Sequence, residues 1–195
     1  GGQLPVSLPG LYERGAGLKL PQTIMRRDIP EAAGLSSEKL YEIDRIMQQA
    51  VQDSVFPGGV VSVVRQGKLI YNEGFGYHDY QKVEAVRASD IYDTASLTKP
   101  IATTAATMML IDSGQLSLDT PIASYFEEFA EDSTRARITI EHLLNHTSGL
   151  PAFRTYVDEL KTKDEILQAI RLEPLINTPG EAMVYSDLGF ILLAE

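Results

Sequence analysis

The 195-residue chain contains no cysteine and no tryptophan, and basic residues are in the minority. The lack of cysteine excludes a disulfide scaffold, a cysteine-ligated zinc and a thiol nucleophile. Lysine and arginine total 17 against 27 acidic residues, which gives a formal net charge of −10. Such an acidic balance argues against binding to nucleic acid or to an anionic membrane surface, because both need clustered basic side chains.

Long hydrophobic runs are also lacking. The longest weakly polar stretch, residues 101–111, is interrupted by threonines and is too short to span a bilayer, so no transmembrane segment is expected. The first residues have neither the basic nor the apolar region of a signal peptide. The three histidines have no zinc-type spacing, and no metal is expected. The lack of cysteine is compatible with either the cytoplasm or the periplasm, so the compartment stays open.

Hydrophobic residues make up 44% of the chain, enough for a folded core. Residues 1–34 are rich in glycine and proline and predict an extended arm or linker, whereas residues 35–195 predict a domain whose sheet is incomplete. Apolar periodicity and capping residues predict helices, and β-branched runs predict a hairpin. The helices are expected at 36–53, 96–113, 139–146, 162–172 and 187–195, and the strands at 60–64 and 69–76. The predicted fold class is therefore α+β, with a hairpin that needs further strands to be stable.

The segment Ser96-Leu97-Thr98-Lys99 places a hydroxyl and an amine three residues apart, where a helix is predicted to begin. Residues at this spacing lie on one helix face and can meet. A serine hydroxyl needs a neighbouring base to act as a nucleophile, and a lysine is a base only when burial or another cation lowers its pKa. Taken alone, the pattern more often means a capping serine beside an exposed lysine.

Three further features accompany this segment. They are the run Leu143-Leu144-Asn145-His146-Thr147-Ser148-Gly149-Leu150, Pro179-Gly180 ahead of Tyr185-Ser186-Asp187, and the helix entry Leu188-Gly189-Phe190. Together the four features resemble the serine β-lactamase and penicillin-binding-protein superfamily, over roughly residues 35–195. The resemblance is strongest to the class C β-lactamase-like branch, which includes esterases and D-aminopeptidases.

The resemblance implies a serine hydrolase that forms an acyl-enzyme with an ester, an amide or a D-amino-acid peptide, linked to cell-wall metabolism. It also favours a periplasmic or secreted location over the cytoplasm of a bacterium, although the compartment stays open. Ser96 would be the acylated nucleophile, and its backbone N–H would be one oxyanion donor. Lys99 would assist removal of the Ser96 proton, and Tyr185 would act as base or proton relay with Lys99. The implied chemistry needs no metal or organic cofactor.

Two departures from the family pattern leave alternatives open. The family has Tyr-x-Asn where this chain has Asp187, and an ionised carboxylate accepts hydrogen bonds but cannot donate them to a substrate amide. The third family motif, Lys-Thr-Gly or a His-x-Gly variant, lies on a later strand and is not found before Glu195. Asp187 remains the expected substrate-binding residue. The alternatives are a non-catalytic, penicillin-receptor-like binding module and a true β-lactamase.

Two smaller expectations complete the sequence-based account. Residues 1–20 resemble the tail of a family-3 glycoside hydrolase, which implies an upstream glycoside hydrolase domain in the parent protein. His146 lies in a turn-forming His-Thr-Ser-Gly segment, and we expect it to shape the floor of the site without taking part in the chemistry.

Overall fold

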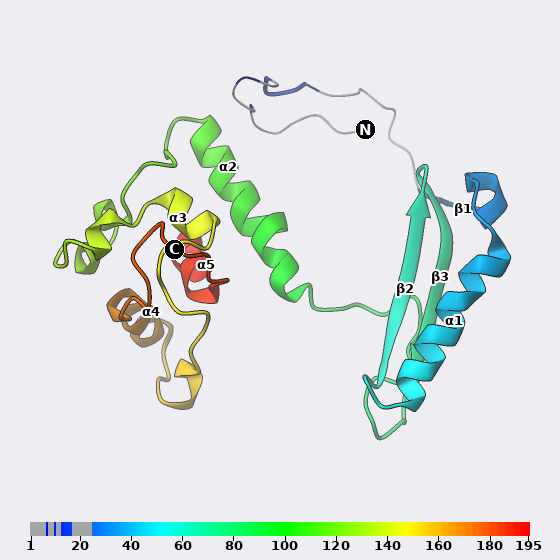
Figure 1. Ribbon diagram of the computed structural model, residues 1–195. Helices are drawn as coiled ribbons and strands as arrows, with labels where there is room; N and C mark the ends of the chain where they lie inside the picture. Colours follow the sequence, from blue (N-terminus) through cyan, green and yellow to red (C-terminus); the bar gives the residue numbers. More distant parts are fainter. Residues whose placement is uncertain (1–6, 8–9, 11–12, 17–24) are drawn as a thin grey trace. The chain divides into compact units, whose positions relative to one another are not determined.

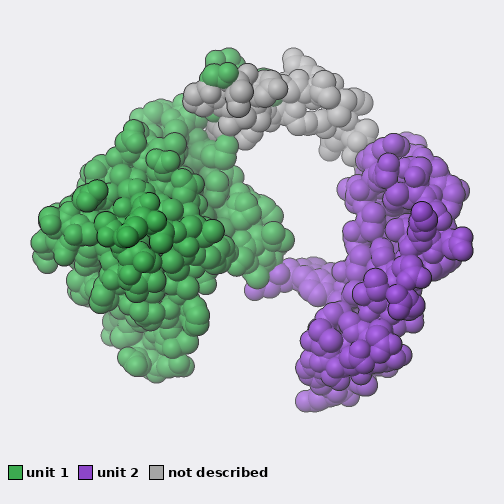
Figure 2. All heavy atoms as spheres, in the orientation of Figure 1, with its two compact units in different colours: residues 1–19, 94–195 green, residues 20–93 purple. Residues whose placement is uncertain are grey.

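The computed structural model describes residues 7, 10, 13–16 and 25–195. The predicted glycoside hydrolase resemblance falls on residues 1–20 and lies mostly outside the described residues. The chain forms two compact units, one of residues 1–19 and 94–195 and the other of residues 20–93 (Figure 2). Among the described residues, no helix is both long and apolar enough to cross a membrane.

The unit of residues 20–93 contains a three-stranded sheet with one helix packed on it (Figure 1). The strands are β1 (Arg26–Arg27), β2 (Gly58–Arg65) and β3 (Lys68–Gly76), in the order β1-β3-β2. The predicted hairpin is present: β2 and β3 are antiparallel, and the two residues between them have left-handed φ angles of 52° and 73°, which suit the right-handed twist of the strands. The backbone of residue 86 passes so close to β3 that a Cβ on Gly74 would lie 2.6 Å from the Val86 oxygen.

The sequence prediction of an unbroken arm over residues 1–34 missed two short elements. β1 pairs in parallel with the start of β3, with Arg26 opposite Lys68. A 3₁₀ helix follows at Pro30–Ala33 and buries Ala33. The described part of residues 1–34 is therefore not wholly extended. The domain boundary between residues 34 and 35 stays a prediction.

The helix α1 (Ser37–Gln52) begins as predicted, because the Ser36 hydroxyl accepts a hydrogen bond from the Lys39 N–H and satisfies one free donor of the first turn. It packs against β3 of its own unit. The mixture of a small sheet and several helices confirms the predicted α+β class.

The other unit is mostly helical. Its α-helices are α2 (Ala105–Asp112), α3 (Ile140–Leu144), α4 (Lys163–Leu172) and α5 (Asp187–Ala194), with 3₁₀ turns at Ala95–Leu97, Ile122–Ser124, Glu127–Phe129, Arg135–Arg137 and Tyr156–Asp158. The predicted capping box at Thr162 is present: its hydroxyl accepts the Glu165 N–H, and the Glu165 carboxylate accepts the Thr162 N–H.

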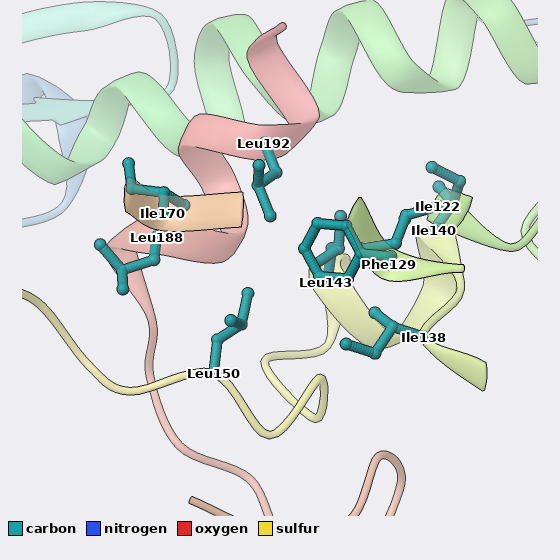
Figure 3. Close-up of a cluster of buried hydrophobic side chains, with 9 residues drawn as sticks. All are labelled: Ile122, Phe129, Ile138, Ile140, Leu143, Leu150, Ile170, Leu188 and Leu192. Carbon is teal, nitrogen blue, oxygen red and sulfur yellow. The ribbon is translucent and has the colours of Figure 1, made fainter. Parts of the chain in front are cut away.

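The core of this unit is a cluster of nine buried hydrophobic side chains gathered around α3 and α5 (Figure 3). They are Ile122, Phe129, Ile138, Ile140, Leu143, Leu150, Ile170, Leu188 and Leu192. Burying one such side chain stabilises the fold by about 1.5–3 kcal/mol. Leu188 and Leu192 are one helical turn apart, so α5 turns this face to the core and is free to present its other face to the site.

Candidate active site

The nucleophile candidate lies in an irregular helical start. Ser96 is in the 3₁₀ turn Ala95–Leu97, and a π-helical segment, Lys99–Thr104, leads from there into α2. The helix predicted over 96–113 is therefore present, but its first half is 3₁₀-helical and π-helical, and only Ala105–Asp112 is α-helical. Ala95 has a φ of 43°, a left-handed conformation that is uncommon for a residue with a side chain. Backbone irregularities of these two kinds are concentrated at functional sites.

Two threonines lie on either side of this turn in the chain. The side-chain oxygens of Thr94 and Thr98 are 3.1 Å apart and form a hydrogen bond across it. Ser96 between them is exposed, so its hydroxyl is open to a substrate. The irregular start thus holds the serine at the surface and does not bury it in a regular helix.

The Lys99 ammonium brings the four predicted site residues together. Its Nζ lies 3.3 Å from the Ser96 Oγ and 2.6 Å from the Asp187 Oδ1, and the Tyr185 hydroxyl is near enough to raise the pKa of Lys99. Two of the three N–H donors of the ammonium therefore have acceptors at hydrogen-bond distance, on Ser96 and on Asp187. Nζ also lies 4.8 Å from the centroid of the Tyr185 ring, within the range of a cation–π contact. The side chain of Lys99 is only 15% exposed, which strengthens these interactions.

The pKa values of Lys99 and Tyr185 are displaced in opposite directions. Burial lowers the pKa of Lys99, but the hydrogen bonds to Asp187 and Tyr185 outweigh burial and leave it above its ordinary value. The pKa of Tyr185 is lowered, first by the hydrogen bond from Ser96 and then by the one from Lys99. The condition set by the sequence for Lys99 as a base, a lowered pKa, is therefore not met. Of the two, Tyr185 is the group whose basic form is favoured.

The site opens into a pocket of about 470 Å³. Its lining includes the polar side chains of Ser96, Lys99 and Asp187 and the apolar side chains of Phe190 and Ile191. Asp187 and Ile191 lie one turn apart on α5, on a different face from the pair that enters the core. The pocket can therefore place an apolar substrate group beside the hydroxyl and the charged groups.

The peptide that carries Tyr185 and Asp187 is anchored to the first turn of α5 and to the neighbouring segment of residues 151–152. Ser186, the N-cap of α5, accepts the Gly189 N–H at 3.2 Å and donates its hydroxyl to the Pro151 carbonyl at 2.7 Å. The Asp187 N–H donates to the Ala152 carbonyl at 2.8 Å. These bonds fix where α5 begins, and so they fix Tyr185 and Asp187 relative to Lys99.

His146 is the site residue whose position the sequence did not reveal. Its ring packs against the rings of Tyr185 and Phe190, with centroids 4.4 and 5.0 Å away. Its Nδ1 accepts the Ser186 N–H at 3.0 Å. The sequence signal was the run that contains His146, which we interpreted as a turn because a single sequence does not show the contact with residues 40 positions later.

The other two histidines do not join this site. His142 is the N3 residue of the capping box of α3, and its Nδ1 accepts the N–H of the N-cap residue Thr139 at 3.2 Å. His78 pairs with Asp90 at 2.8 Å in the other unit. Among residues 7, 10, 13–16 and 25–195, no group of three or more histidine, aspartate or glutamate side chains is arranged to hold a metal ion.

A family model described as Beta-lactamase matches residues 43–195. Among curated proteins, Protein flp of Staphylococcus aureus (strain N315) is 30% identical over 165 residues, which cover 82% of this chain and 33% of that protein. A protein of Escherichia coli O157:H7, named as a provisional D-alanyl-D-alanine carboxypeptidase, is 30% identical over 190 residues. The match covers 87% of this chain and 43% of that protein. The chain thus spans between a third and a half of the length of these relatives.

Solved structures with the same arrangement include a class C beta lactamase, with a TM-score of 0.66 and 27% identity over 83% of this chain and 44% of that one. The octameric penicillin-binding protein homologue from Pyrococcus abyssi has a TM-score of 0.64 and 26% identity over 79% of this chain and 37% of that one. The D-amino acid amidase from Ochrobactrum anthropi SV3 has a TM-score of 0.63 and 27% identity over 77% and 42%.

The family match covers well over half of the chain, and the structural matches agree with it in fold. The chain therefore belongs to the beta-lactamase family, a family of serine hydrolases.

Proposed function

We propose that the chain carries the acylation site of a serine hydrolase that acts on an ester, an amide or a D-amino-acid peptide. The observation that carries this proposal is the Lys99 ammonium, which hydrogen-bonds to Ser96 and Asp187 and lies 4.8 Å from the centroid of the Tyr185 ring. The hydroxyl nucleophile, a tyrosine whose pKa is lowered and a fixed cation are therefore grouped at one place. These are the parts that nucleophilic acyl transfer requires.

In the proposed reaction Tyr185 starts as the phenolate. The Ser96 Oγ attacks the substrate carbonyl carbon, and its proton passes to the phenolate oxygen of Tyr185. Tyr185 then gives this proton to the departing alcohol or amine as the carbonyl–leaving-group bond breaks, which leaves an ester on Ser96. A water molecule attacks that ester, gives its proton to Tyr185 and releases the acid, and the proton returns to Ser96. Whenever Tyr185 is deprotonated in this cycle, the Lys99 cation stabilises the negative charge on its oxygen.

The substrate side of the proposal draws on the neighbours as well as on the pocket. The D-amino acid amidase shares the fold, and a further structural neighbour, SurE, with 25% identity and a TM-score of 0.61, was solved with D-Leu. The apolar wall of Phe190 and Ile191 suits an uncharged side chain next to the reacting carbonyl. Asp187 presents an acceptor where the family's asparagine also donates, which disfavours β-lactam amides relative to esters and simple D-aminoacyl amides.

The test is a substrate panel of p-nitrophenyl butyrate, D-alanine p-nitroanilide and a chromogenic cephalosporin, measured for the wild type and for Ser96→Ala and Tyr185→Phe. We expect turnover of the ester or the anilide, none with Ser96→Ala, and a loss of about 10²–10⁴-fold with Tyr185→Phe, as for removal of a general base. Turnover of all substrates that persists in Ser96→Ala would refute the proposal.

A second function, a binding module that is acylated but does not turn over, is favoured by one observation. Asp187 favours the protonated form of Lys99, so among the residues grouped with Ser96 only Tyr185 is left to activate the water for deacylation. If Tyr185 does not activate that water, the acyl group stays on Ser96. The same panel separates the two functions. A binding module gives a single stoichiometric burst of product, whereas a hydrolase continues to a steady rate.

A further inference from the structure

His146 contacts the Tyr185 segment through three separate parts of the residue. Its backbone carbonyl accepts the Val184 N–H at 2.8 Å, its Nδ1 accepts the Ser186 N–H at 3.0 Å, and its ring lies 4.4 Å from the Tyr185 ring at an angle of 36°. The two hydrogen bonds therefore flank Tyr185 on both sides in the chain, while the ring contact limits where its side chain can turn.

We infer that His146 is a positioning residue for Tyr185, and that it holds the phenol in line with Ser96 and Lys99 through an Nδ1 that must stay unprotonated. The inference rests on the proposed role of Tyr185 and goes beyond the expectation that His146 only shapes the floor of the site.

The backbone of His146 supports this assignment. Its φ is 58°, a left-handed conformation that histidine, asparagine and aspartate adopt more readily than bulkier residues. In this conformation both the carbonyl and the side chain of His146 reach the segment of residues 184–186. A histidine serves here because it combines tolerance of this φ with an aromatic face and an acceptor at the δ1 position.

The accepting Nδ1 also fixes the tautomer. A neutral imidazole has one N–H, so Nδ1 can accept the Ser186 N–H only if the proton is on Nε2. The charged or titratable groups that face the ring are Lys99, Asp187 and Tyr185. Burial and the Lys99 cation lower the pKa of His146 and outweigh Asp187, which keeps the ring neutral at neutral pH.

Protonation of His146 in acid would reverse the arrangement. Nδ1 would become a donor facing the Ser186 N–H, which is also a donor, so that hydrogen bond would be lost. The Tyr185 segment would then keep only its backbone bond to His146 and the ring contact. We therefore expect Ser96 reactivity to depend on two groups in acid, Tyr185 and His146.

A matched pair of variants separates the two contributions of the side chain. His146→Asn keeps an acceptor at the δ1 position and tolerates the left-handed φ, but loses the ring. His146→Phe keeps the ring and loses the acceptor. For both, the rate of Ser96 labelling by a fluorophosphonate and the ionisation of Tyr185, followed by NMR of its ring carbon bonded to oxygen, are measured against pH.

If the Nδ1 acceptor is what positions Tyr185, His146→Asn should label within about threefold of the wild type, whereas His146→Phe should lose about 10–100-fold, the scale of a misplaced catalytic group. Tyr185 should ionise at higher pH in His146→Phe. In acid, the logarithm of the wild-type labelling rate should fall with a slope near two, and that of His146→Asn with a slope near one.

The outcomes keep this inference apart from the proposed function. An unchanged Tyr185 ionisation in His146→Phe would overturn the inference, whatever the labelling rates. If the wild type is not labelled at Ser96 while Tyr185 still responds to His146→Phe, the proposed function fails and the positioning role stands. If His146→Phe does not fold, the acid slopes of the wild type and His146→Asn decide, and equal slopes would overturn the inference.

Discussion

The replacement Asp187→Asn tests how the charge on Asp187 sets the protonation of its neighbours. The change removes one negative charge at nearly constant shape and leaves an amide that can still accept from Lys99. The ion pair is short, with Lys99 Nζ 2.6 Å from Asp187 Oδ1. Coulomb's law at an effective dielectric constant of about 20 gives a gross attraction of about 6 kcal/mol at this distance.

Most of that attraction does not appear as a net effect, because the Asp187 side chain is 50% exposed and solvent screens the pair. A hydrogen bond between two charged groups contributes about 1 kcal/mol more than one to a neutral amide. We therefore expect Asp187→Asn to weaken the interaction that stabilises the Lys99 ammonium by about 1 kcal/mol and so to lower the pKa of Lys99.

The assay is the pH profile of Ser96 labelling or of ester turnover. Asp187 raises the pKa of Lys99, so its neutralisation should move the alkaline limb, where the ammonium is lost, to lower pH. Asp187 also opposes ionisation of Tyr185, so the acid limb should move to lower pH as well. Both limbs should shift in the same direction, and the optimum should become more acidic.

A matched control is Asp164→Asn, an exposed carboxylate in the first turn of α4 whose loss changes the net charge equally. It should leave both limbs in place. An alkaline limb that stays fixed or moves to higher pH in Asp187→Asn would refute the reasoning, because Lys99 would then not depend on the Asp187 charge.

Two stability predictions concern the segments that support the site. Gly149→Ala should lower the free energy of unfolding by about 2 kcal/mol or more, because φ is +82° and the new Cβ would lie 2.1 Å from the Asn177 oxygen. The control Gly114→Ala, where φ is +73° and the space is open, should lower it by about 1 kcal/mol. Equal losses in urea melts would contradict this prediction. Glu173→Gln should cost about 1–3 kcal/mol in thermal or urea melts, since the nearly buried carboxylate accepts both the Tyr156 hydroxyl and the Arg154 guanidinium; an unchanged melt would show that the charge is dispensable.

Local sequence signals predicted those parts of the fold that local chemistry determines. The helices α1 and α4 begin where Ser36 and Thr162 cap them, since the donor and the acceptor of each cap lie three residues apart. The hairpin follows from its β-branched strands and its two-residue turn. In contrast, β1 consists of two arginines with no apolar pattern, and only its pairing with β3 some 40 residues later defines it.

The site shows the same division. The spacing of Ser96 and Lys99 and the resemblance of their surroundings predicted the group that the structure brings together, but not its electrostatics. Whether Lys99 is a base or a fixed cation depends on a contact with Asp187, 88 residues away in the chain. The positioning contact of His146 with the Tyr185 segment also spans about 40 residues, so neither could be derived from spacing alone.

The central claim, that Ser96 is an activated nucleophile, is tested most directly by intact-mass spectrometry after incubation with a fluorophosphonate probe. The account predicts one adduct per chain on the wild type, located on Ser96 by peptide mapping, no adduct on Ser96→Ala, and much slower labelling of Tyr185→Phe. A wild type that gains no adduct, or an adduct that persists in Ser96→Ala, would contradict it.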